Sequence, residues 1–280
     1  MLHMTSTQLI LTNMNETIFI VGEGWGNECA KIGLGRRFSK VIPVTGCVGV
    51  ELNDLRGETI VFAGYKPIVP NDVLSVNTCI NVHYSLLPKY RGFHSTVWAI
   101  LNDEDELGLS VHLMSKFIDD GPIIHQYRVE NDRIKTSCEY MELFNEYIAD
   151  NLGRIIEDYL CSRTQLICNN KNEATWVGKR NHDDCKIDFN RDLDYLQRFF
   201  RALVAPYPLP YILYKGDELI VTQVGFYKVN VETHVGRILN IDDDGLWVKV
   251  KDGYLIIKEM RDSSNNIVPY DKFKIGYFLK

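Results

Sequence analysis

Long apolar runs are missing from this chain. No stretch approaches the ~18 consecutive apolar residues that read as a transmembrane helix, and the N-terminus has no basic segment followed by a long apolar core. The pattern therefore predicts neither a membrane span nor a signal peptide. Paired cysteines are missing too: the 7 cysteines are scattered and form no Cys-x-x-Cys pair. This argues against a disulfide framework or a zinc knuckle and is typical of reduced thiols in a cytoplasmic protein.

An excess of positive charge is also absent. The chain has 31 Lys and Arg against 37 Asp and Glu, which gives a net charge of −6. An acidic protein lacks the counterion-release term that dominates nucleic-acid affinity, so we expect no nucleic acid and no membrane as partner. The 280 residues, of which 45% are hydrophobic, are enough for one large or two medium domains with real cores.

The first half of the chain alternates short apolar runs with helical patterns. The runs are bounded by Gly or Pro, as buried parallel strands are, and lie at residues 17–21, 41–45, 59–63 and 79–82. Further strands are predicted at 109–114 and 123–129. A Thr136-x-x-Glu139 capping box predicts the start of a long amphipathic helix. Residues 8–12 fit either a short strand or a tail. This alternation predicts an α/β, Rossmann-like layer.

The pattern of apolar and polar residues changes after a polar, irregular segment at residues 164–190. A helix is predicted near 193–204 and ends at a proline cluster, 206–210. Short alternating strands joined by tight turns follow, at residues 211–214, 219–222, 237–241, 247–250 and 254–258. We therefore predict two domains, an α/β domain with linker at 1–190 and a smaller, mainly β domain at 191–280.

Asn81 and His83 are the first candidate site residues. They end a predicted strand and share one face of it, because side chains alternate with period two. An Asp119-Asp120-Gly121 sequence closes a second apolar run. Amide, imidazole and carboxylate are the groups that acyl transfer to an amine requires. The alternative is an Asn and a His that only hydrogen-bond nearby loops, but the Ser-Leu-Leu-Pro and Arg-Gly sequences just downstream favour a functional site.

These motifs resemble one family closely. The sequence NVHYSLLPKYRG at residues 81–92, followed by IDDGPII at 118–124, resembles the N10-formyltetrahydrofolate-dependent formyltransferases. The family includes methionyl-tRNA, glycinamide ribonucleotide and sugar N-formyltransferases. The resemblance covers residues 59–163, and a second set of motifs at 179–208 resembles the joint to an OB-like C-terminal domain. It implies a Rossmann-like formyltransferase domain followed by an OB-like β domain.

The resemblance also assigns roles. His83 would be the general base for the attacking amine, Asn81 would hydrogen-bond the formyl oxygen, and Asp119 would orient His83. Asp120 competes for the last role, although the family's spacing favours Asp119. N10-formyltetrahydrofolate would be the cosubstrate. No metal is implied, and no His-Glu-x-x-His ligand set is present.

Cofactor contacts follow by the same resemblance. The pterin would lie near Gly64, Tyr65 and the 118–121 loop, which includes Asp120. Leu86 and Pro88 would line the slot, with ordinary loop packing as the alternative. Arg91 and Gly92 are also predicted to bind the cofactor. Arg91 is either a donor to a phosphate or carboxylate or part of a loop-fixing salt bridge. The remaining histidines are interpreted as structural or surface residues: His94, His112, His125, His182 and His234.

Departures from the family guide the choice of acceptor. The basic loop of the tRNA enzymes has no counterpart between Val44 and Glu58, and the C-terminal region mixes Lys with many Asp and Glu. We therefore expect a sugar N-formyltransferase that acts on a nucleotide-linked amino-dideoxy sugar, by analogy a dTDP-linked 4-amino sugar of O-antigen biosynthesis. Methionyl-tRNA formyltransferase is the first alternative. The second is a non-catalytic module that binds folate or oligonucleotide. Apolar residues such as Phe226, Tyr227 and Trp247 predict a homodimer through the β region.

Overall fold

The computed structural model describes residues 14–44 and 51–280, so the segment 8–12 lies outside the described residues. Two compact units make up the chain. The first contains the described residues up to Gly92 together with Gly108–Val129 and Met141–Trp176, and the second contains Phe93–Leu107, Glu130–Tyr140 and Val177–Lys280. The simpler division at residue 190 remains a prediction. Among the described residues, no helix is long and apolar enough to cross a membrane.

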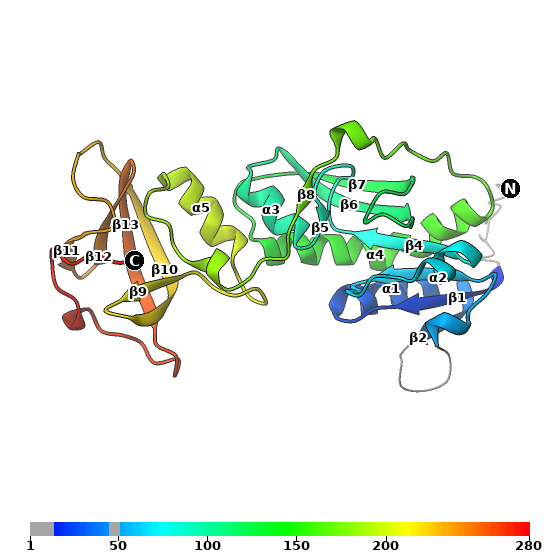
Figure 1. Ribbon diagram of the computed structural model, residues 1–280, viewed down its shortest axis with the longest axis horizontal. Coiled ribbons are helices and arrows are strands. Elements are labelled where there is room, and N and C mark those ends of the chain that lie inside the picture. Colours follow the sequence, from blue (N-terminus) through cyan, green and yellow to red (C-terminus); the bar gives the residue numbers. More distant parts are fainter. Residues whose placement is uncertain (1–13, 45–50) are drawn as a thin grey trace, which may run out of the picture. The chain divides into compact units, whose positions relative to one another are not determined.

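A six-stranded mixed sheet forms the centre of the first unit (Figure 1). Its order is β2-β1-β3-β4-β6-β7, and the strands are β1 (Met14–Val21), β2 (Phe38–Val44), β3 (Thr59–Ala63), β4 (Thr78–His83), β6 (Glu106–Leu113) and β7 (Ile123–Glu130). The first four strands are parallel, whereas β6 runs antiparallel to β4. The α/β fold predicted from the strand runs is thus confirmed, with an antiparallel neighbour that the pattern did not reveal.

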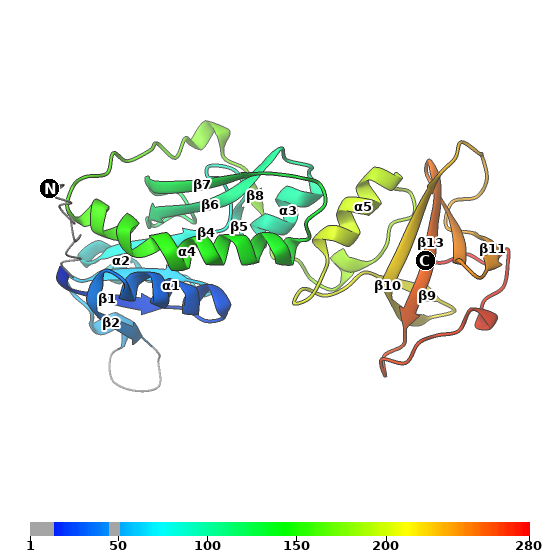
Figure 2. The same cartoon turned by 180° about the vertical axis from the view of Figure 1, so that it is seen from behind.

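Both faces of this sheet are buried, which explains its nearly continuous apolar strands. Ile18 and Ile20 of β1 are almost completely buried on one face, and Phe19 packs into a cluster with Phe62 and Val73 on the other. Helices α1 (Trp25–Gly35) and α4 (Ser137–Leu160) lie along one face, in front of the sheet in Figure 2. The opposite face carries the short helix α2 (Asn71–Val76) and the 3₁₀ turn Leu52–Asp54.

The predicted capping box starts α4. The Thr136 backbone N–H donates to Glu139 Oε2 at 2.7 Å, and the Glu139 N–H donates to Thr136 Oγ1 at 3.3 Å. The helix packs closely on α1 because glycines face it: a Cβ on Gly33 would lie 2.4 Å from the Ile148 carbonyl oxygen. Side chains at helical spacing bury the inner face of α4, namely Phe144, Ile148, Leu152 and Ile156.

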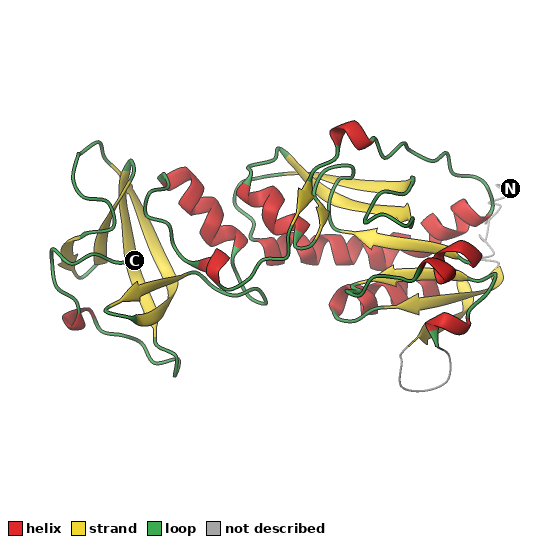
Figure 3. Cartoon of the chain, viewed as in Figure 1, coloured by secondary structure: helices red, strands yellow, loops and turns green. Residues whose placement is uncertain are grey.

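The second unit contains the C-terminal sheet and its own helices (Figure 3). Helix α5 (Leu193–Ala202) is capped by Asp192, whose carboxylate accepts from the Tyr195 N–H at 2.8 Å. Helix α3 spans Ser95–Leu101. The five-stranded sheet has the order β11-β12-β13-β10-β9, and each pair of neighbouring strands is antiparallel. Its strands are β9 (Tyr211–Tyr214), β10 (Asp217–Lys228), β11 (Ile238–Asp242), β12 (Gly245–Val250) and β13 (Gly253–Arg261). The predicted β domain is therefore confirmed.

Short elements complete the chain. The strands β5 (Arg91–Gly92) and β8 (Trp176–Val177) form a two-stranded sheet of their own. The remaining 3₁₀ turns are Lys171–Glu173, Asp183–Cys185 and Tyr270–Lys272. Tyr227 on β10 is half exposed at 51%, but this exposure does not test the predicted homodimer, which remains a prediction.

The packing of α4 on α1, where Leu152 lies against Gly33, should contribute strongly to the stability of the first unit. Leu152 is 0% exposed, so we expect Leu152→Ala to lower the free energy of unfolding by about 3–5 kcal/mol through lost burial and a residual cavity. Leu166→Ala is the matched control. That side chain is 41% exposed, so its loss should cost below about 1 kcal/mol. Urea unfolding monitored by circular dichroism measures both, and equal losses would contradict the assigned core.

Candidate active site

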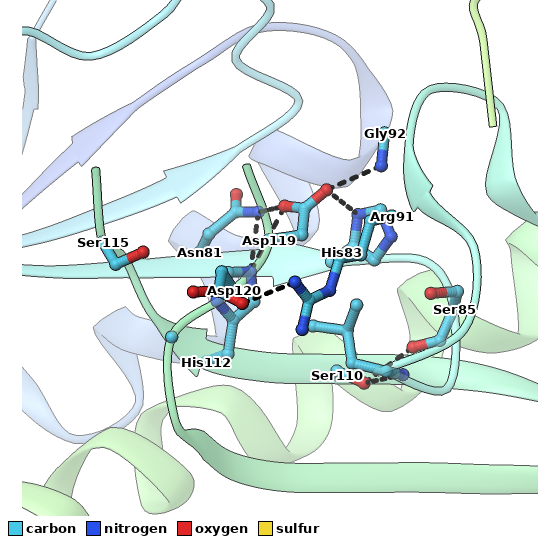
Figure 4. A network of polar contacts seen from close by, with 12 residues as sticks. Asn81, His83, Ser85, Arg91, Gly92, Ser110, His112, Ser115, Asp119 and Asp120 are labelled. Carbon is cyan, nitrogen blue, oxygen red and sulfur yellow. Dashed lines mark hydrogen bonds and ion pairs between the residues drawn. The ribbon is translucent and has the colours of Figure 1, made fainter. Parts of the chain in front are cut away.

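The carboxyl end of β4 carries the site (Figure 4). Asn81 and His83 lie on the same face of this strand, two residues apart. In the antiparallel register with β6, Asn81 is directly opposite His112 and His83 is directly opposite Ser110. Directly opposed residues of an antiparallel pair project from the same face of the sheet. Four polar side chains therefore meet on one patch, which is buried except at Asn81.

His83 is held as a neutral base. Its Nε2 lies 2.9 Å from the backbone carbonyl oxygen of Tyr90, which can only accept, so Nε2 carries the hydrogen. The unprotonated Nδ1 then faces Asp119, with 3.6 Å between Nδ1 and Oδ2. Burial lowers the pKa of His83, and the Asp119 carboxylate opposes this only partly. An imidazole with a lowered pKa is predominantly neutral at pH 7 and can take up a proton at Nδ1.

Asp119 is a buried carboxylate with several partners. Its Oδ2 accepts from the Gly92 backbone N–H at 2.8 Å, and its Oδ1 lies 3.4 Å from Asn81 Nδ2 and 3.5 Å from His112 Nε2. Burial raises the pKa of Asp119, but His83, His112 and Gly92 together lower it below its ordinary value. The carboxylate therefore stays ionised. It supplies a fixed negative charge beside both histidines.

His112 was missed by sequence reasoning, which treated it as a structural or surface residue. Its Nδ1 lies 2.8 Å from the Leu113 carbonyl oxygen and so carries a hydrogen, leaving Nε2 of the neutral ring as an acceptor. Asn81 Nδ2 donates to that Nε2 at 3.2 Å. His112 thus fixes the orientation of the Asn81 amide. A polar residue alternating with Ser110 in an otherwise apolar strand was the only signal in the sequence.

Arg91 and Asp120 form a pair beside the site. Arg91 Nη1 donates to Asp120 Oδ1 at 2.5 Å, and Lys171 Nζ lies 3.2 Å from Asp120 Oδ2. The Arg91 guanidinium is also bonded to Asn169. These are the contacts of a loop-fixing salt bridge, one of the two interpretations of Arg91. Arg91 and Lys171 thus bind the Asp120 carboxylate, whereas the Asp119 carboxylate lies next to His83.

Gly64 and Tyr65 lie at the end of β3, in the predicted pterin region. Gly64 is exposed with φ +69°, and a Cβ there would lie 2.4 Å from the Glu23 carbonyl oxygen, so the close approach requires glycine. Tyr65 is half-buried, with its ring 5.4 Å from that of Phe62. No contact joins either residue to Asn81, His83 or Asp119 among the described interactions. Their role toward a cofactor remains a prediction.

The loop with Leu86 and Pro88 is anchored from β6 and β7. The Leu87 N–H donates to Ser110 Oγ at 3.1 Å, and Gln126 Nε2 donates to the Leu87 carbonyl at 2.8 Å. Leu86 packs over Gly108, where a Cβ would come within 2.5 Å of Leu86 Cδ2. Pro88 is half-buried. Both residues therefore have structural contacts, and whether they also line a slot for folate remains a prediction.

Two family models match the chain. One, described as formyl transferase, matches residues 47–149, and the other, described as formyl transferase C-terminal domain, matches residues 179–277. A curated relative, the methionyl-tRNA formyltransferase of Caldanaerobacter subterraneus, is 30% identical over 81% of this chain and 74% of its own length. Among the described residues, no cluster of three His, Cys, Asp or Glu side chains is placed to hold a metal ion.

Solved structures share the fold. HypX from Aquifex aeolicus, determined with tetrahydrofolic acid, matches with a TM-score of 0.68 at 16% identity over 92% of this chain. The chain spans only 47% of HypX. An N-formyltransferase from Helicobacter canadensis, determined with folinic acid and dTDP-3-aminofucose, matches with a TM-score of 0.66 at 19% identity. That match covers 88% of this chain and 99% of the other.

The coupling between Asp119 and His83 predicts a measurable titration. We expect the His83 imidazole to titrate below the ordinary value of about 6.5 because burial disfavours its charged form. Asp119→Asn should lower the pKa of His83 further, since the carboxylate stabilises the imidazolium. Imidazole NMR signals followed against pH measure this. His125, which lies on β7 outside the site, serves as the control and should not shift. A His83 pKa that rises in Asp119→Asn would contradict the assigned geometry.

Proposed function

This chain belongs to the formyl transferase family, and we propose that it moves the formyl group of N10-formyltetrahydrofolate to the amine of a nucleotide-linked amino-dideoxy sugar, by analogy a dTDP sugar. The tetrahydrofolic acid and folinic acid in the two structural neighbours support a folate donor. The dTDP-3-aminofucose in one of them supports the acceptor class. The net charge of the chain is the observation that favours this acceptor over a tRNA.

The proton of the amine goes to His83. The amine nitrogen attacks the formyl carbon and forms a new C–N bond, while Nδ1 of His83 accepts the proton that this nitrogen loses. The resulting imidazolium lies 3.6 Å from Asp119 Oδ2, which stabilises it. When the tetrahedral intermediate collapses, the bond between the formyl carbon and N10 breaks. His83 returns its proton to N10, and tetrahydrofolate leaves.

Asn81 stabilises the developing oxyanion. Its Nδ2 has two hydrogens: one donates to His112 at 3.2 Å, and the other makes the longer 3.4 Å contact with Asp119. The longer contact is the weaker one, so this hydrogen can turn to the formyl oxygen as negative charge builds there. A single donor to an oxyanion typically contributes about 10²–10³ in rate.

Electrostatics favour a small acceptor over a tRNA. A protein that docks a tRNA stem must neutralise several phosphates with Lys and Arg. This chain has net charge −6, lacks a basic loop between Val44 and Glu58, and mixes acidic with basic residues throughout its C-terminal region. A nucleotide-linked sugar carries only a diphosphate and can be held by few cations. The acceptor is therefore proposed to be a nucleotide-linked amino sugar.

Methionyl-tRNA is the second candidate acceptor. Curated relatives at 26–30% identity are methionyl-tRNA formyltransferases, for example those of Finegoldia magna and Clostridium beijerinckii. The catalytic steps at His83 and Asn81 would be the same for either amine. The two functions differ in the surface that the rest of the acceptor must contact.

An acceptor screen separates the two. Purified protein with N10-formyltetrahydrofolate is offered dTDP-linked 3-amino and 4-amino sugars or methionyl initiator tRNA, and release of tetrahydrofolate is followed. We expect turnover with an amino sugar and none with the tRNA. His83→Ala controls for contaminating activity and should lower turnover by at least about 10², as loss of a general base does. Turnover with tRNA alone, together with salt-sensitive tRNA binding in a gel shift, would overturn the sugar assignment.

A further inference from the structure

Asp119 lies in a backbone conformation that needs support. Its φ is +49°, in the left-handed region that residues other than glycine seldom adopt. Two residues later, a Cβ on Gly121 would lie 1.9 Å from the Leu113 carbonyl oxygen, so the chain turns back tightly against β6. A non-glycine residue in such a conformation is strained and persists only when its surroundings hold it.

Asn169 holds this turn from a distant part of the chain. Its side chain is 8% exposed, and its Nδ2 donates to the backbone carbonyls of Asp119 and Gly121, each at 2.9 Å. Its Oδ1 accepts from Arg91 Nη2 at 2.7 Å. Each polar atom of the Asn169 amide therefore has a partner. Two of the three bonds go to the carbonyls on either side of Asp120.

Arg91 links Asn169 to the turn that contains Asp119 and Asp120. Its second terminal nitrogen, Nη1, donates to Asp120 Oδ1, so one planar guanidinium joins Asn169 to the residue after Asp119. Gly92, the next residue of β5, donates its backbone N–H to the Asp119 carboxylate itself. The backbone and the carboxylate of Asp119 are thus fixed by the same neighbouring segments.

We propose that Asn169, acting with Arg91, is a positioning residue for formyl transfer: it holds the Asp119 turn so that the carboxylate stays in place beside His83 and Asn81. This rests on the proposed function for its kinetic consequence, but its structural consequence at His83 does not. Asn169 has no contact with His83 or Asn81 among the described interactions, and it acts only through the loop.

Removing the Asn169 amide should loosen the turn. The Asp119 and Gly121 carbonyls would lose their donors in a mostly buried region, which disfavours the present conformation. A shift of about 1 Å in a catalytic group can cost about 10²-fold in rate. Acceptor binding would change little, because Asn169 is not proposed to touch the acceptor. The expected signature is a loss in kcat with the KM for the acceptor preserved.

The experiment compares Asn169→Ala with Asn170→Ala. Asn170 is the matched control because, within the part of the chain that the structure describes, its side chain bonds only to Asn172 and Glu173 of the local 3₁₀ turn. We expect Asn169→Ala to lower kcat about 10- to 100-fold, with KM for the acceptor amine within about threefold of the wild type. The pKa of His83, followed by NMR, should fall because the carboxylate moves away. Asn169→Gln, which keeps both amide groups, should recover part of the rate, and Asn170→Ala should behave as the wild type.

A second variant keeps the test decisive if Asn169→Ala does not fold. Arg91→Lys retains the positive charge beside Asp120 but cannot reach both Asp120 and Asn169, so it should show the same loss in kcat and the same fall in the pKa of His83. A His83 pKa and a kcat unchanged in a folded variant would overturn the proposal. If the wild type transfers formyl to no amine while the His83 pKa still falls in Asn169→Ala, the proposed function fails and the positioning role stands.

Discussion

The buried carboxylate of Asp119 is the interaction on which this site depends. A carboxylate removed from water is stable only where hydrogen-bond donors and positive charge replace the lost hydration. Here the Gly92 N–H and the Asn81 amide donate to the carboxylate, and the imidazolium that forms when His83 takes up a proton lies beside it. The same contacts that keep Asp119 ionised orient the groups that handle the formyl oxygen and the amine proton. The contacts that stabilise the buried charge are therefore also the contacts that organise the site.

The fold supplies those partners from separate places. β4 places Asn81 and His83 on one face, and the antiparallel β6 places His112 opposite Asn81. The turn with Asp119 is then held against them by Asn169 and Arg91. Rigid strands carry the amide and the imidazole, whereas the carboxylate is on a turn that requires added bonds. The need to hold this turn explains why the buried side chains of Asn169 and Arg91 form hydrogen bonds around it.

Local sequence patterns were sufficient to predict most of the helices and strands. The runs at 59–63 and 211–214 coincide with β3 and β9, and the capping box at Thr136 marks the start of α4. Periodicity and capping act within a few residues, so a single sequence contains their signal. Asn81, His83 and Asp119 were found as candidates because the motif order was recognisable, and the structure brings them together.

What the sequence could not show depends on long-range register. Nothing local indicates that β6 is antiparallel to β4, so the pairing of His112 with Asn81 was invisible, and His112 was set aside as structural. Asn169 lies in a polar segment that resembles a linker, and its bonds reach back 48 and 50 residues to Gly121 and Asp119. Arg91 was left between two interpretations for the same reason, since its partner Asn169 was unknown.

The most direct test compares two adjacent aspartates whose carboxylates face different partners. Asp119→Asn and Asp120→Asn each remove one negative charge from the same turn, and formyl transfer by each is measured as kcat/KM. If Asp119 is the carboxylate that organises His83 and Asn81, Asp119→Asn loses at least about 10² in kcat/KM, comparable with loss of acid–base catalysis, and Asp120→Asn loses less than about tenfold. Equal losses, or a larger loss in Asp120→Asn, would contradict the central place given to Asp119.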